Sequence, residues 1–119
     1  MAQHNELGRT AEQMAVEYLE RKGYKILARN WRYGKAEIDI IALDGDTLAV
    51  VEVKARTSDY FGDPAHFVNP KKIKRLVEAA DAYMRQNELD YEVRFDIISI
   101  LKNRKQQKIK HIENAFYWY

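Results

Sequence analysis

Residues 37–54 read EIDIIALDGDTLAVVEVK, and this stretch decides the fold. Two apolar runs flank the Asp-Gly-Asp triplet at 44–46, and Asp-Gly is among the strongest short signals for a tight turn between antiparallel strands. The second run, 47–54, is apolar at both alternating sets of positions, as is typical of a strand buried on both faces. The stretch therefore predicts a β-hairpin whose second strand lies inside the protein.

Two acidic residues lie within this hairpin, where an isolated buried charge is costly. If Gly45-Asp46 forms the turn, Asp39 lies directly opposite Glu52 on one face of the hairpin. If Asp44-Gly45 forms the turn, Asp39 becomes a diagonal neighbour of Glu52. A three-residue turn without a bulge would separate the two carboxylates.

Two carboxylates on one face repel each other unless a cation lies between them or one of them is protonated. Mg²⁺ or Mn²⁺ suits such a pair, because these ions take one or two carboxylates together with phosphate oxygens. Lys54 shares the face of Glu52 and would supply positive charge for a phosphate. The alternative is a structural cluster in which Asp39, Glu52 and Lys54 neutralise one another, and spacing alone does not separate the two.

A third carboxylate comes from the N-terminal segment. Residues 6–22 show the period of an amphipathic helix. Glu12 lies on the flank of the apolar arc, whereas Glu6, Glu17 and Glu20 lie on the polar side. Glu12 is either a boundary glutamate that reaches water or a carboxylate aimed from the helix at the metal.

The remaining periodicities complete the fold. Strands are predicted at 24–32, 91–101 and 108–119, and a second helix at 69–87. The order αβββαββ predicts an α/β sandwich, in which helices cover a mixed central sheet. Residues 57–68 are expected to form a mobile loop at the mouth of the site. The aromatic tail 116–119 is expected to complete the last strand and cover the core, or else to mark a dimer surface.

A basic cluster opens the second helix. Asn69 suits the N-cap and Pro70 the first helical position. Cations in the first turns oppose the helix dipole but make the helix start a good phosphate anchor. The candidate nucleic-acid-binding residues are Lys71, Lys72, Lys74 and Arg75, extended by Arg29, Arg32 and Arg56. The alternative is an ordinary solvated basic face.

A resemblance covers nearly the whole chain. It rests on Gly8 and Glu12 in the first helix, Asn30-Trp31-Arg32, Glu37-Ile38-Asp39, Val51-Glu52-Val53-Lys54 and Arg94-Phe95-Asp96. These motifs resemble the bacterial YraN-type family of the restriction-endonuclease-like (PD-(D/E)xK) nuclease superfamily. The Gly8 to Glu12 spacing is also similar to that of archaeal Holliday-junction resolvases. One departure is Ala36, where the family usually has glycine, and it affects the backbone at the strand entrance rather than the acids.

The resemblance implies a restriction-endonuclease-like three-layer sandwich and a metal-dependent nuclease that hydrolyses DNA, with branched or structured DNA as a candidate substrate. It implies that Asp39, Glu52 and Glu12 hold Mg²⁺ or Mn²⁺ and that Lys54 joins them in catalysis. One alternative is a nucleic-acid-binding module that keeps the nuclease fold without cleaving. Another is a protein-interaction scaffold, which predicts neither metal nor nucleic-acid binding.

Composition narrows the remaining choices. The 119 residues suffice for a single domain over 1–119. The chain has no cysteine, which excludes disulfides and thiolate zinc sites, and its three histidines are not at metal-ligand spacing. No apolar run is long enough to cross a membrane, and the first residues lack a signal-peptide pattern, so the cytoplasm is the expected location. No small-molecule cofactor is expected, and a homodimer is an option if both strands of a duplex are cut.

Overall fold

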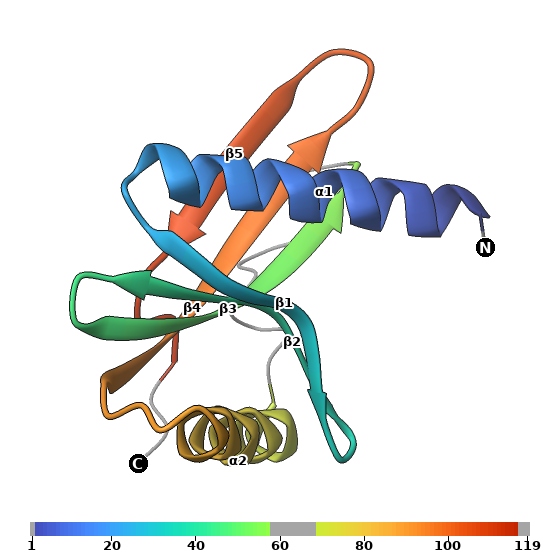
Figure 1. Ribbon diagram of the computed structural model, residues 1–119. Coiled ribbons are helices and arrows are strands. Elements are labelled where there is room, and N and C mark those ends of the chain that lie inside the picture. The colour runs from blue at the N-terminus through green and yellow to red at the C-terminus, as the bar shows by residue number, and fades with distance from the viewer. Residues whose placement is uncertain (1, 58–68, 117–119) are drawn as a thin grey trace.

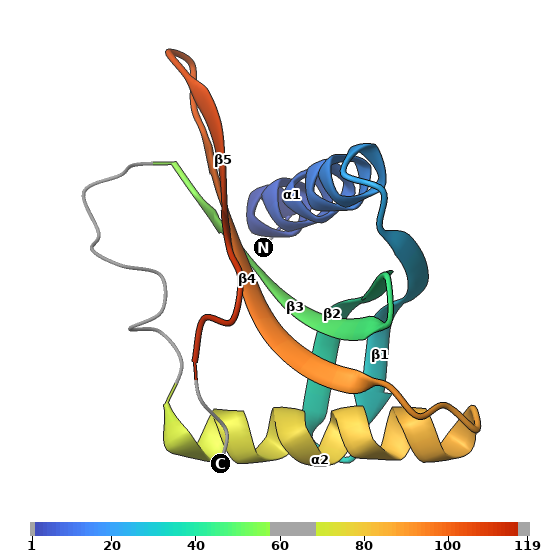
Figure 2. The same cartoon turned by 90° about the vertical axis from the view of Figure 1, so that its left-hand side faces the viewer.

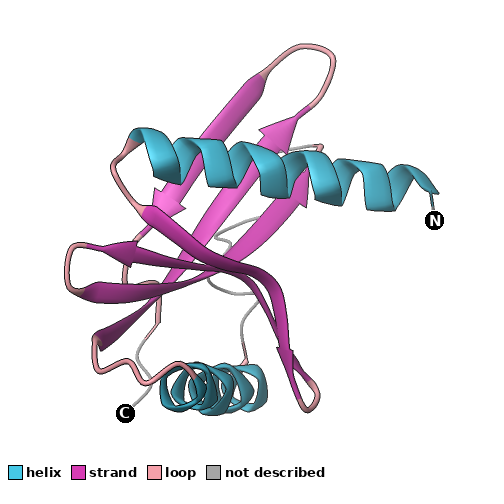
Figure 3. Ribbon diagram, viewed as in Figure 1, coloured by secondary structure: helices cyan, strands magenta, loops and turns pink. Residues whose placement is uncertain are grey.

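The fold is a five-stranded sheet with one helix on each face (Figures 1 and 3). The computed structural model describes residues 2–57 and 69–116, with side chains from Leu7 onward. The elements in chain order are α1 (Ala2–Arg21), β1 (Lys25–Tyr33), β2 (Ala36–Asp44), β3 (Thr47–Arg56), α2 (Pro70–Gln86), β4 (Glu92–Lys102) and β5 (Gln107–Ile112). The predicted order αβββαββ is confirmed.

The strands lie in the sheet in their chain order. Neighbouring strands are antiparallel except β3 and β4, which are parallel and are connected through α2. Figure 2 shows α1 on one side of the sheet and α2 on the other. The predicted three-layer α/β sandwich with a mixed sheet is therefore confirmed.

The hairpin adopts the first of the two turns considered. Asp44 pairs with Thr47, and the register continues without a shift to Ile40 and Val51. Gly45 has a φ of +63°, a left-handed conformation that glycine adopts without steric cost. The turn is therefore Gly45-Asp46, and the same register places Asp39 opposite Glu52.

Each face of the sheet has its own apolar core. The core under α1 contains Leu19, Ile40, Val51, Ile98 and Ile100. The core under α2 contains Ile38, Ile41, Val50, Leu76 and Phe95. Strand β3 supplies side chains to both, which confirms that it is buried on both faces. Burying side chains of this kind contributes roughly 1.5–3 kcal/mol each, and the two cores hold the helices in place over the hairpin.

Two ends differ from expectation by more than two residues. Helix α1 begins at Ala2 rather than at residue 6. Strand β5 ends at Ile112, so the prediction of a strand from 108 to 119 was wrong for 113–116. There Asn114 has a φ of +52°, and Ala115 donates a backbone hydrogen bond of 2.8 Å to the carbonyl of Phe95. The chain turns back over β4 at this point.

Phe116, the first residue of the aromatic tail, stacks on Phe95 with ring centroids 5.2 Å apart. It therefore covers the core as expected. The rest of the tail, 117–119, and the predicted loop at 58–68 lie outside the described residues. No helix in the described part of the chain is both long enough and apolar enough to cross a membrane.

Candidate active site

The site is organised by a bend in β2 at Asp39. Ile38 packs in the core against α2, whereas Ile40, two residues later, packs in the core against α1. Side chains two apart on a flat strand face the same way, so β2 twists sharply between them. The pairing of β1 with β2 resumes on both sides of this point but leaves out Asn30 and Asp39. Figure 1 shows β1 and β2 curving together.

The side chain of Asp39 contacts β3 just beyond the point where the backbone pairing of β2 with β3 ends. The last pair between β2 and β3 is Ile40 with Val51, and beyond it the backbone N–H of Val53 donates to Asp39 Oδ2 at 2.8 Å. This bond holds the carboxylate of Asp39 against β3, on the side where Glu52 lies. The hairpin therefore brings two carboxylates together, as the sequence predicted.

Burial and the negative charge of Glu52 raise the pKa of Asp39 to about 8, against the Val53 hydrogen bond, which lowers it. Glu52 itself is only 5% exposed. Asp39 therefore carries a proton at neutral pH when no cation offsets the two charges. Such mutual repulsion is typical of carboxylates arranged to share a cation or a proton.

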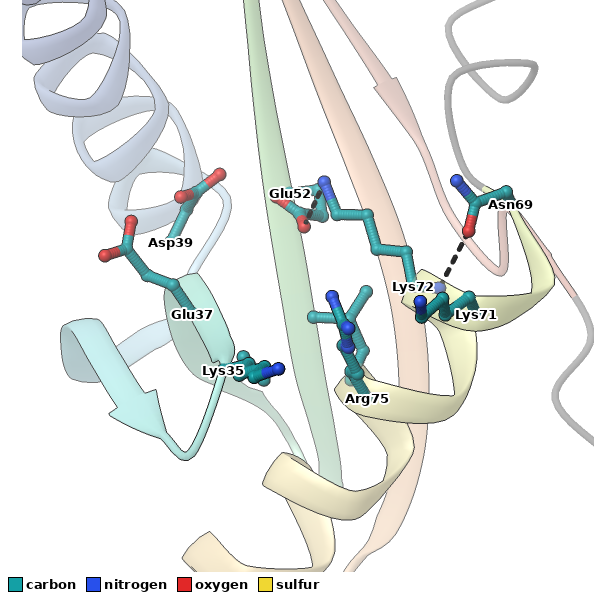
Figure 4. A pocket seen from close by; sticks show the side chains of 10 residues that line it. Lys35, Glu37, Asp39, Glu52, Asn69, Lys71, Lys72 and Arg75 are labelled. Atoms are coloured by element: carbon teal, nitrogen blue, oxygen red, sulfur yellow. Dashed lines mark hydrogen bonds and ion pairs between the residues drawn. The ribbon is translucent and has the colours of Figure 1, made fainter.

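A lysine from α2 reaches this pair. Lys72 Nζ lies 3.0 Å from Glu52 Oε1 (Figure 4). Burial lowers the pKa of Lys72, but Glu52 outweighs it and the pKa is raised overall. Burial and the nearby charge of Lys72 lower the pKa of Lys54. The site thus combines two acids with two lysines, and Lys72 rather than Lys54 makes the described ion pair with Glu52.

Two cavities meet at this bend. The first has a volume of about 410 Å³ and is lined by Lys35, Ala36, Glu37, Asp39, Glu52, Asn69, Lys71, Lys72, Arg75 and Leu76. The second has a volume of about 640 Å³ and is lined by Gly8, Arg9, Ala11, Glu12, Asn30, Glu37, Asp39, Val53 and Ala55. Glu37 and Asp39 line both cavities, so these two residues mark the boundary between them.

Glu12 reaches the second cavity but is held by β1. Its Oε1 accepts hydrogen bonds from Asn30 Nδ2 at 2.8 Å and from Arg29 Nη2 and Nε at 3.2 and 3.3 Å. Asn30 makes this bond from a left-handed backbone with a φ of +51°. Within residues 2–57 and 69–116, no three acidic or histidine side chains lie close enough together to hold a metal ion. Asp39 and Glu52 are thus a two-carboxylate site with Glu12 in the adjoining cavity.

The predicted phosphate-binding residues divide into two groups. Lys71, Lys72 and Arg75 line the first cavity, as expected for the start of α2. Asn69 caps this helix by accepting a 2.9 Å hydrogen bond from the Lys72 backbone. Lys74 is exposed on α2 and is not among the described residues that line either cavity.

The arginines from the strands are absent from the described lining of both cavities. Arg29 pairs with Glu12, and Arg32 Nε lies 2.8 Å from Glu37 Oε2. Arg56 ends β3 and does not appear in the described lining of either cavity. Lys35 was missed by sequence reasoning, although its place beside the turn at Gly34, just before the Glu37–Asp39 motif, was a usable signal.

The acidic residue of the Arg94-Phe95-Asp96 motif, Asp96, belongs to a separate cluster. It is fully buried, and its two oxygens accept hydrogen bonds of 2.9 Å from Arg94 Nε and Nη2. His111 Nε2 lies 2.8 Å from Asp96 Oδ2. Asp96 is absent from the described lining of both cavities, and its contacts with His111 of β5 and with the backbone N–H of Asn114 fasten β4 to the chain that follows it.

Comparison with known proteins places the whole chain in a family. Residues 11–100 match the model of "Uncharacterised protein family UPF0102". A UPF0102 protein of Christiangramia forsetii is 55% identical over 119 residues and covers 100% of both chains. A UPF0102 protein of Flavobacterium psychrophilum is 54% identical, over 98% of both chains. One of Bacteroides thetaiotaomicron is 50% identical, over 98% of this chain and 97% of its own. Because the family model matches most of the chain and these relatives align with nearly all of it, the chain belongs to the UPF0102 family.

Proposed function

We propose that the protein is a metal-dependent nuclease that hydrolyses DNA phosphodiester bonds. The observation that carries this proposal is the position of Asp39 and Glu52. Their side chains interact and both line the first cavity, which is also bordered by Lys35, Lys71 and Arg75, and Asp39 lines the second cavity as well. Acids that attract a metal thus lie next to cations that attract phosphate, a combination suited to metal-dependent phosphodiester hydrolysis.

The donor set fits Mg²⁺ or Mn²⁺. Asp39 and Glu52 offer hard oxygen ligands, and such ions commonly take one or two carboxylates and complete their shell with water and substrate phosphate oxygens. Burial and the charge of Glu52 raise the pKa of Asp39. A divalent cation between the two carboxylates would offset their repulsion. Glu12 would contribute directly or through a water molecule from the adjoining cavity. A bound divalent ion supplies an activated water and polarises a phosphoryl oxygen.

The chain's own residues bind and orient the substrate. Backbone phosphates bind at the first cavity, which is lined by Lys35 and, from the start of α2, by Lys71 and Arg75. Lys54 lies near enough to Glu52 and Asp39 for their charges to favour its ammonium form, and this ammonium stabilises the negative charge that develops on the phosphate. The similarity of the Gly8 to Glu12 spacing to that of Holliday-junction resolvases favours branched or otherwise structured DNA.

A second candidate is a nucleic-acid-binding module that does not cleave. It is favoured by the contacts of Glu12, which is bound to Arg29 and Asn30, and by the ion pair of Glu52 with Lys72. In that case the basic border of the first cavity would bind nucleic acid in a salt-dependent manner, and divalent metal would change nothing.

The test is a titration of Mg²⁺ or Mn²⁺ with labelled single-stranded, duplex, flap and four-way DNAs, run beside Glu52→Ala and Lys74→Ala. We expect metal-dependent cleavage by the native protein and by Lys74→Ala, and none by Glu52→Ala. Salt-sensitive binding without cleavage on every DNA would instead establish the binding module. If neither binding nor cleavage occurs, both candidates are wrong.

A further inference from the structure

The second cavity contains a glycine that the fold does not require. Gly8 lies inside α1, where glycine is the least favourable residue after proline. The glycines with positive φ in the described chain are Gly23, Gly34 and Gly45, so Gly8 has no such backbone reason. A Cβ added at Gly8 would meet no described atom within 4 Å. Neither backbone conformation nor helix packing therefore explains this glycine.

The open side of Gly8 belongs to the cavity of about 640 Å³. The neighbouring lining residues Ala11, Val53 and Ala55 are also small and apolar. They belong to α1 and to the end of β3, and the rest of the lining is polar: Arg9, Glu12, Asn30, Glu37 and Asp39. A cavity of this volume and lining suits a flat organic group rather than a bare anion.

The two cavities differ in chemistry on either side of Asp39. The first is bordered by Lys35, Lys71, Lys72 and Arg75 and suits phosphates. The second has a single described lysine or arginine, Arg9, and small side chains beside α1. A nucleic-acid strand alternates phosphates with nucleosides, so a strand that passes Asp39 presents a phosphate to one cavity and a nucleoside to the other.

We infer that the second cavity binds a nucleoside of the substrate strand, next to the phosphate that is cut, and that this nucleoside packs directly on the backbone of α1 at Gly8. The inference rests on the proposed function. Arg9 then contacts the phosphate on the far side of that nucleoside. Gly8 is a positioning residue, because any side chain there would occupy the space of the nucleoside.

The test uses Gly8→Ala, with Thr10→Ala as the matched control. Both changes favour the helix, but Thr10 is not among the described residues that line the cavity. Each protein is measured for Tm and for binding of a fluorescein-labelled DNA by anisotropy in Ca²⁺, and cleavage is then followed in Mg²⁺. A further variant, Gly8→Leu, places a larger side chain at the same position, so that the effect of side-chain size on DNA binding can be followed.

Gly8→Ala should raise Tm by about 4 °C and yet weaken DNA binding by roughly tenfold, with a larger loss for Gly8→Leu. Thr10→Ala should bind DNA like the native protein. Native-like binding and cleavage by Gly8→Ala would overturn the inference and leave the proposed nuclease standing. Equal weakening by Thr10→Ala would also overturn it, because helix stabilisation would then be the cause. A native protein that neither binds nor cleaves DNA would overturn both.

Discussion

Lys72 Nζ lies 3.0 Å from Glu52 Oε1, so a cation of the protein itself neutralises the carboxylate that we assign to the metal. A divalent ion and the Lys72 ammonium would compete for the same oxygen. A DNA phosphate at the first cavity offers Lys72 another partner, because Lys72 lines that cavity. Metal and DNA should therefore bind more tightly together than either does alone.

The first prediction concerns Lys72→Met. The change leaves Glu52 buried without its partner, which should cost about 1–2 kcal/mol of unfolding free energy, since Lys72 is about one third exposed. Added Mn²⁺ should recover this loss, so Mn²⁺ should raise the Tm of Lys72→Met more than that of the native protein. Lys71→Met, which removes an exposed lysine of the same helix, is the control. An equal Mn²⁺ effect on all three proteins would contradict the competition.

The second prediction follows from the pKa of Asp39, which is raised to about 8. In the unfolded chain an aspartate loses its proton near pH 4. Between these values the folded protein binds more protons, so its stability falls as pH rises from about 4 to about 8. Asp39→Asn cannot ionise and should escape this loss.

Urea unfolding in the presence of a chelator checks this dependence. At pH about 9, Asp39→Asn should be more stable than the native protein by more than about 1 kcal/mol, and the difference should shrink towards pH 5. Two parallel stability curves would show that the carboxylate of Asp39 is not under electrostatic strain.

The third prediction separates binding from chemistry at Lys54. Lys54→Met keeps the length of the side chain and removes its charge, so DNA binding in Ca²⁺ should stay within about twofold of native. Cleavage in Mg²⁺ should fall by about 100-fold or more, because a donor that stabilises the transition-state charge is lost. Lys74→Met, on the exposed side of α2, should cleave normally. Native rates for Lys54→Met would remove Lys54 from the catalytic set.

The fourth prediction concerns Asp96, which is buried against Arg94 and His111. Asp96→Asn should cost about 3 kcal/mol, because it leaves a partly buried arginine without its bidentate partner. Glu113→Gln removes a half-exposed partner of the same arginine and should cost less than about 1 kcal/mol. Chemical unfolding measures both. Below its lowered Tm, Asp96→Asn should still cleave DNA; loss of cleavage in a fully folded sample would assign Asp96 to the site.

The local pattern of the hairpin was sufficient to predict the approach of Asp39 to Glu52. A two-residue turn fixes the register, and the register fixes which side chains face each other. The order of helices and strands along the chain also followed from hydrophobic periodicity. The end of β5 did not, because Glu113 and the residues after it leave the sheet to satisfy Asp96 and Phe95, which are distant in the sequence.

The parts of the site that sequence reasoning missed depend on packing between elements. The pair of Lys72 with Glu52 requires the position of α2 over β3, which no local pattern encodes. The hydrogen bond from Asn30 to Glu12 requires a left-handed backbone conformation at Asn30, where β1 bends. The sequence shows only an ordinary strand residue there. Contacts between helices and strands therefore determine which of the predicted lysines and arginines line the first cavity.

The parallel pairing of β3 with β4 also affects how the protein is made. This pairing joins Glu52 to Ile97, with the whole of α2 between them in the chain. Contacts between residues so far apart form late, since the intervening chain must first lose its freedom. A ribosome that has released only the hairpin has thus produced Asp39 and Glu52, the acids proposed to bind a metal, without the strand that supports them. We expect the nascent chain to complete this site only after β4 has emerged, so the proposed nuclease would stay inactive until then.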